Sequence, residues 1–168
     1  QTHSDTEVIV HAWAVWGEDC VRKLRGMFAF AIWDTRKEIL FLARDRLGIK
    51  PLFYTLLPDG QFLFGSELKV IVEHPGLRRS LDVRAVEEYF ALGYVPEPRT
   101  IYGEVCKLPP AHMLTIARGG AAVQPKAYWD LSFYPAQNLD HARIGEELIA
   151  RFKETVDLHL MSEVPLGA

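Results

Sequence analysis

The sequence predicts an α+β fold followed by the beginning of an α/β unit. Between residues 27 and 129, apolar runs alternate with short polar or glycine-containing stretches, a pattern that indicates antiparallel hairpins. Helical patterns precede and interrupt these runs. A long amphipathic stretch from Leu139 to Leu160 then leads into the apolar run Val164-Pro165-Leu166, which indicates a helix that enters a new strand.

The first element is a predicted helix over residues 5–16. Ser4 stands three residues before Glu7, which is the spacing of a capping box, and apolar residues follow at helical intervals. Gly17 then provides a stop signal. A further short turn of helix is predicted near residues 21–24, where apolar side chains again recur at helical spacing.

Three hairpins and two more helices follow. Each hairpin joins two apolar runs through a turn of polar residues, proline or glycine. The paired runs are residues 27–33 with 39–43, residues 51–57 with 61–64, and residues 113–117 with the region up to Trp129. The two helices are residues 68–72 and residues 82–92, the second with Asp82 as its N-cap and Gly93 as its stop.

A polar, proline-containing stretch marks the predicted domain boundary. We therefore predict a first domain over residues 1–131, a linker over residues 132–139, and the start of a second domain over residues 140–168.

Composition excludes several classes of function. The 168 residues are 49% hydrophobic, with a formal net charge of -3, so no basic surface for nucleic acid is predicted. No apolar run approaches the roughly 20 residues of a membrane span, and no signal peptide is visible. The two cysteines, Cys20 and Cys106, do not form a disulfide framework. A reducing, cytoplasmic location is the expectation.

Few residues point to chemistry on their own. Ser4 and Asp5 are suited to capping a helix. The stretch 44–51 reads as a charged loop between strands, because it lacks the Ser or Thr after its lysine that a phosphate-binding loop needs. Cys20 and Cys106 both lie in apolar surroundings that favour a buried structural role. The six histidines show no metal-ligand spacing, so no metal site is predicted.

Several motifs in a fixed order carry a resemblance to a known family. They are Ser4-Asp5-Thr6-Glu7, Arg44-Asp45-Arg46-Leu47-Gly48-Ile49-Lys50-Pro51-Leu52-Phe53-Tyr54, Tyr94-Val95-Pro96-Glu97-Pro98-Arg99-Thr100-Ile101-Tyr102, Lys107-Leu108-Pro109-Pro110-Ala111-His112, and Met161-Ser162-Glu163-Val164-Pro165-Leu166-Gly167-Ala168. Together the chain resembles glutamine-dependent asparagine synthetases over nearly its whole length. The resemblance implies part of an αββα N-terminal-nucleophile hydrolase sandwich, followed by the first helix and strand of an α/β synthetase domain.

The resemblance implies one site residue within this segment. Asp5 would bind the α-amino group of substrate glutamine, since a carboxylate forms a strong charge-assisted bond to an ammonium. No catalytic, ATP-binding or metal-binding residue is expected here. The cysteine nucleophile is expected upstream of Gln1, and the loop that grips the pyrophosphate of ATP is expected just after Ala168.

For the full-length protein, the resemblance implies ATP-dependent amidation of aspartate with ammonia released from glutamine. Glutamine, aspartate and ATP would be substrates, with Mg²⁺ beside ATP, and the protein would be a homodimer. The isolated segment is predicted to bind no cofactor and to be inactive. Two alternatives stay open: a paralogue that amidates another carboxylate or sugar in surface-polysaccharide or exosortase-linked biosynthesis, and a non-catalytic binding or dimerisation module.

Overall fold

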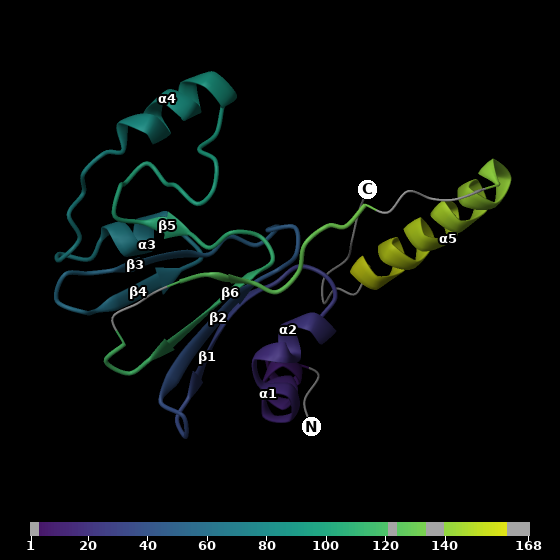
Figure 1. Cartoon of the computed structure of the whole chain (residues 1–168), viewed down its shortest axis with the longest axis horizontal. Helices are drawn as coiled ribbons and strands as arrows, with labels where there is room; N and C mark the ends of the chain where they lie inside the picture. Colours follow the sequence, from purple (N-terminus) through teal and green to yellow (C-terminus); the bar gives the residue numbers. More distant parts are fainter. Residues whose placement is uncertain (1–3, 121–123, 134–139, 161–168) are drawn as a thin grey trace. The chain divides into compact units, whose positions relative to one another are not determined.

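The computed structural model describes residues 4–120, 124–133 and 140–160 of the protein. The backbone forms two compact units, residues 1–130 and residues 131–168. Helices and antiparallel sheets both occur in the first unit (Figure 1), as the α+β prediction requires. The predicted linker falls mostly outside the described residues, and the predicted strand at Val164-Pro165-Leu166 falls entirely outside them.

Two antiparallel sheets form the centre of the first unit. The larger has the strand order β1-β2-β6-β7 and the smaller the order β4-β3-β5. Their strands are β1 (Ala29–Asp34), β2 (Ile39–Arg44), β3 (Phe53–Leu56), β4 (Phe62–Gly65), β5 (Cys106–Lys107), β6 (His112–Ala117) and β7 (Lys126–Ala127). The three predicted hairpins are confirmed as the pairs β1–β2, β3–β4 and β6–β7.

The predicted helices of this unit are also confirmed. They are α1 (Asp5–Trp16), α2 (Cys20–Lys23), α3 (Leu68–Val72) and α4 (Val83–Leu92). Gly17 and Gly93 end α1 and α4 with positive φ angles of 56° and 79°, a conformation that glycine adopts at little cost. Asp82 caps α4 by accepting from the backbone N–H groups of Arg84 and Ala85.

Alternating side chains of the strands bury three apolar clusters. On one face of the larger sheet, Phe41 and Ala43 pack with residues of α1 and α2. On its other face, Leu42 packs against Tyr54 of the smaller sheet. The far face of the smaller sheet is covered by α3, where Ile71 is buried. The order of layers is therefore helix, sheet, sheet, helix. Strand β2 is apolar from Ile39 to Ala43 because both of its faces are covered.

Three details differ from the sequence predictions. The Ser4 hydroxyl accepts from the N–H of Thr6 rather than from Glu7, so the cap bond falls one residue earlier than a capping box predicts. Strand β3 begins at Phe53 rather than at Pro51, because Pro51 and the residue after it belong to the connection between the sheets. Strand β5 was not predicted, since two residues are too short to show an alternating pattern.

Residues 82–101 form an excursion whose two ends meet. Leu81 forms a β-bridge with Tyr102. The N–H of Asp82 donates to the carbonyl of Ile101 at 3.0 Å, and the N–H of Gly103 donates to the carbonyl of Ser80, also at 3.0 Å. The excursion carries α4 and rejoins the smaller sheet at β5.

The described part of the second unit is dominated by helix α5 (His141–His159). It confirms the predicted long helix, although it begins two residues later than the apolar pattern indicates. The predicted apolar stripe, which includes Leu148, Phe152 and Val156, lies exposed along it. Among the described residues, no helix combines the length and the apolar character that spanning a membrane requires.

Candidate functional site

The connection between the two sheets is organised around Asp45, whose side chain is 1% exposed. One carboxylate oxygen, Oδ1, accepts from the backbone N–H groups of Leu47 and Ile49 at 3.1 and 3.0 Å. The other, Oδ2, accepts from Lys50 at 3.0 Å and from Phe28 at 3.3 Å. A single buried carboxylate thus satisfies four backbone donors and fixes the path of the chain from β2 to β3.

Arg44 binds the backbone carbonyls of the same connection, whereas Asp45 binds its N–H groups, and the side chain of Arg44 is also buried. Its guanidinium donates to the carbonyls of Lys50, Gly48 and Leu108 at 2.6–2.7 Å. It also pairs with Glu97 at 2.6 Å, which ties the excursion to the connection. The rigid fork of donors on arginine suits this divergent set of carbonyls, whereas lysine would reach only part of it.

Three further contacts lock the connection in place. Arg46 donates to the carbonyls of Leu24 and Arg22, which are left without helical partners at the end of α2. The Tyr128 hydroxyl donates to the carbonyl of Arg44 at 2.7 Å, and burial raises the pKa of Tyr128 to about 12. Gly48 has a φ of 67°, and an added Cβ would lie 2.8 Å from a ring carbon of Pro110.

This geometry explains the charged motif at residues 44–50 without a ligand. An anion held by a loop needs free backbone N–H groups. Here the N–H groups of Leu47, Ile49 and Lys50 point to the carboxylate of Asp45, and that of Gly48 donates to the Asp45 carbonyl at 3.2 Å. The donors that a phosphate would use are therefore already occupied by the chain itself.

Asp5, the residue predicted to bind glutamine, lies in the first turn of α1 and is exposed. Its Oδ1 accepts from the backbone N–H of Thr6 at 2.7 Å, so the carboxylate is held at the positive end of the helix. The described residues give its Oδ2 no hydrogen-bond partner.

Both cysteines are free thiols with structural surroundings. Cys20 is fully buried beneath α1, and burial raises its pKa. Burial also raises the pKa of Cys106, which lies opposite Tyr54 in the register of β3 and β5. A raised pKa disfavours the thiolate that a nucleophile requires. Within the described ranges, no cluster of three or more His, Cys, Asp or Glu side chains is placed to hold a metal ion.

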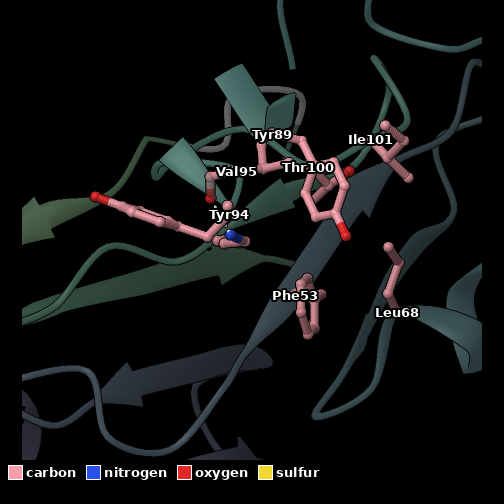
Figure 2. Close-up of a pocket in the computed structure, with 9 residues that line it drawn as sticks. Phe53, Leu68, Tyr89, Tyr94, Val95, Thr100 and Ile101 are labelled. Atoms are coloured by element: carbon pink, nitrogen blue, oxygen red, sulfur yellow. Dashed lines mark hydrogen bonds between the residues drawn. The ribbon is translucent and has the colours of Figure 1, made fainter. Parts of the chain in front are cut away.

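A cavity of about 510 Å³ lies between the excursion and the outer face of the smaller sheet. Figure 2 shows Phe53, Leu68 and Ile101 around one side of it, with the ring of Tyr89 reaching toward them from α4. Lys107 of β5 also lines the cavity. Sequence reasoning did not find this cavity, because its lining residues are scattered from position 53 to position 107 and form no local motif.

The family of the chain follows from comparison with known sequences. Residues 1–129 match the glutamine amidotransferase domain family, so the chain belongs to that family. It is 39% identical to asparagine synthetase [glutamine-hydrolyzing] 3 of Bacillus subtilis, over 97% of this chain and 26% of that protein.

Two other relatives show the range of the similarity. The putative asparagine synthetase [glutamine-hydrolyzing] 2 of Methanocaldococcus jannaschii is 37% identical over 100% of this chain and 33% of its own length. Amidase chyE of Penicillium rubens is 34% identical over 98% of this chain and 24% of its own length. The chain thus spans about a quarter to a third of the length of these curated relatives.

Proposed function

We propose that this chain is part of a glutamine-hydrolysing asparagine synthetase. The observation that carries the proposal is the similarity, over nearly the whole chain, to relatives with that printed name at 36–39% identity. In the parent protein, glutamine would be hydrolysed at a cysteine, and the ammonia released would amidate the side chain of aspartate in an ATP-dependent step. The product would be asparagine.

In this proposal, residues 1–131 are the C-terminal part of an N-terminal-nucleophile hydrolase sandwich, and residues 140–168 begin the synthetase domain. The order of layers in the first unit, helix, sheet, sheet and helix, supports the first assignment. The parent would be a cytoplasmic homodimer. Gel filtration of the parent protein with light scattering measures the oligomeric state directly.

ATP and Mg²⁺ would bind to other parts of the parent protein. The described residues do not fit them: no carboxylate cluster is placed for a cation, and the loop donors suited to phosphate are used by Asp45. Burial raises the pKa of both Cys20 and Cys106 and so disfavours a nucleophilic thiolate, and we predict that the purified 168-residue chain shows no glutaminase activity. Turnover of glutamine by that chain would contradict this part of the proposal.

Asp5 would hold the α-amino group of glutamine. Its exposed carboxylate has one oxygen without a partner in the described structure, and it carries the negative charge that an ammonium needs. We expect Asp5→Asn in the parent protein to raise the KM for glutamine by roughly tenfold or more. Activity with free ammonia as the nitrogen donor should not change, because ammonia bypasses the glutamine pocket.

Asp19→Asn is the matched control, since Asp19 also carries an exposed carboxylate near α1, with 74% of its side-chain surface accessible. It should leave both activities unchanged. An Asp5→Asn parent with an unaltered KM for glutamine would contradict the assignment of Asp5, while the proposed overall reaction would still stand on the ammonia-dependent activity.

A second candidate function is amidation of an acceptor other than aspartate. The 34% identity to a protein named amidase chyE favours keeping this alternative. The test is to incubate the parent protein with glutamine and ATP and to compare aspartate with other carboxylates and amino sugars as acceptors. Product formation with aspartate alone supports asparagine synthesis, whereas product formation only with another acceptor overturns it.

A further inference from the structure

The cavity between α4 and the smaller sheet has largely apolar walls. Phe53 of β3 and Leu68 of α3 contribute apolar surface from two elements, and Ile101 contributes more from the end of the excursion. The ring of Tyr89 enters the same space from α4 (Figure 2). The volume of about 510 Å³ lies within the range of small-molecule sites. An apolar ligand body would therefore lose part of its contact with water here.

The charge that the described residues place in the cavity lining is positive. Among the described residues, Lys107 is the sole charged one in the lining, and none of the described carboxylates lines it. The nearby carboxylates already have cationic partners: Glu97 pairs with Arg44, and Glu88 pairs with Arg99. An anionic group would thus meet a positive charge in the cavity without displacing an existing ion pair from its wall.

The ammonium of Lys107 has donors to spare. It donates to the carbonyl of Val95 at 2.5 Å, its one hydrogen bond among the described residues. An ammonium carries three N–H donors, so two remain for a ligand. Burial lowers the pKa of Lys107 although the carboxylate of Glu97 acts in the opposite direction, so the ammonium is poorly solvated and would gain from a second anionic partner.

We propose that this cavity binds a small organic acid that combines an apolar body with one carboxylate. The body lies against Phe53, Leu68 and Ile101, and the carboxylate accepts hydrogen bonds from Lys107. The hydroxyl of Tyr89 supplies a further polar group at the same cavity. The proposal is independent of the amidotransferase reaction, because none of these residues belongs to the glutamine pocket assigned to Asp5.

The test compares two probes that share one apolar body. Phenylbutyrate carries a carboxylate, and phenylbutanol carries a neutral hydroxyl in its place. We expect calorimetric titration to give phenylbutyrate a dissociation constant of about 2 mM, as its size allows. Phenylbutanol should bind at least about fivefold more weakly, because it lacks the charge-assisted bond. Contacts from the phenyl ring to the methyl groups of Leu68 and Ile101 in nuclear Overhauser spectra should locate the ligand.

Two variants separate the role of Lys107 from a general effect of charge. Lys107→Met should weaken phenylbutyrate to the level of phenylbutanol and leave phenylbutanol unaffected. Lys69→Met removes an exposed cation from α3, next to the lining residue Leu68, and should change neither affinity. Equal binding of the two probes to the unmodified protein overturns the proposal. So does the failure of phenylbutyrate to bind at roughly 20 mM, ten times its expected dissociation constant. Because the two probes are compared on the unmodified protein, this test does not depend on whether either variant folds.

Discussion

Asp5 and Asp45 are both carboxylates in motifs that identify the family, yet the structure places them in opposite situations. Asp5 is exposed in the first turn of α1 and uses one oxygen on a neighbouring N–H. Asp45 is 1% exposed and accepts four backbone hydrogen bonds. A motif can therefore be highly characteristic of the family and still have a purely structural role. The number of hydrogen bonds that the chain itself supplies tells a structural carboxylate from one free to bind a ligand.

Removal of the buried carboxylate should have the largest effect. Asp45→Ala leaves the N–H groups of Phe28, Leu47, Ile49 and Lys50 without their acceptor, a carboxylate that is itself buried. We expect the free energy of unfolding to fall by about 3–5 kcal/mol. Urea denaturation followed by tryptophan fluorescence measures it. A loss below about 1 kcal/mol would show that water replaces the carboxylate and that the contrast with Asp5 is overstated.

Gly48 tests whether the connection tolerates any extra atom. Gly48→Ala forces a positive φ on alanine and places its Cβ 2.8 Å from Pro110 and 3.0 Å from the guanidinium of Arg44. We expect a loss of roughly 1–3 kcal/mol in the same denaturation experiment.

Gly103→Ala is the matched control for that variant. No atom lies within 4 Å of the Cβ position at Gly103, and its φ is not in the left-handed region. Its free energy of unfolding should stay within about 0.5 kcal/mol of the unmodified protein. Equal losses in the two variants would mean that the tight approach of Gly48 to its neighbours does not matter.

Two buried phenols should make stability depend on alkaline pH. Burial raises the pKa of both Tyr54 and Tyr128 to about 12, from an ordinary value of 10.0. The folded protein therefore retains these protons where the unfolded chain has lost them. Their contribution is fully present below about pH 10 and is lost as the pH rises from about 10 to about 12. Below about pH 10, these two groups should not change the urea concentration at the midpoint of unfolding. Between about pH 10 and about pH 12, that midpoint should decrease.

A matched pair of variants sharpens the pH prediction. Tyr128→Phe removes one phenol and its bond to the carbonyl of Arg44, so the alkaline fall should become shallower. Tyr94→Phe is the control, because Tyr94 is 61% exposed and should leave the slope unchanged. A fall of unaltered steepness in Tyr128→Phe would assign the alkaline transition to other groups.

The smallest effect on stability is expected at the exposed carboxylate. Asp5→Ala removes a negative charge from the start of α1, where it interacts with the helix dipole, while Ser4 keeps its cap bond. The free energy of unfolding should fall by about 0.5 kcal/mol. A loss as large as that of Asp45→Ala would mean that Asp5 is also a structural residue and would weaken its proposed role in glutamine binding.

The elements that the sequence predicted well are those with local signals. Helix α4 begins at a capping aspartate and ends at a glycine, so both of its bounds follow from side-chain chemistry. The hairpin of β3 and β4 is marked by a turn with proline, aspartate and glycine. Such features depend on neighbours in the chain, and neighbours are visible in a sequence.

The features that escaped prediction depend on residues far apart in the chain. Arg44 meets Glu97 across 53 positions, and strand β5 exists because β3 lies beside it. The cavity lining combines β3, α3, α4 and β5 in the same way. The prediction that Asp5 binds glutamine came from family resemblance, since Ser4 and Asp5 ahead of a helical pattern are equally suited to helix capping alone.

The meeting of the two ends of the excursion has a consequence for how this fold can vary in length. The N–H of Gly103 donates to the carbonyl of Ser80. The two points where the chain leaves and rejoins the sheet region are therefore held together, whatever the length of the segment between them. Residues can be added to exposed parts of this segment with little change in the entropy of closing the loop, whereas a deletion that removed Glu97 would take away the ion pair of the buried Arg44. A peptide tag inserted at the end of α4, after Leu92, which is 55% exposed, should leave the sandwich intact.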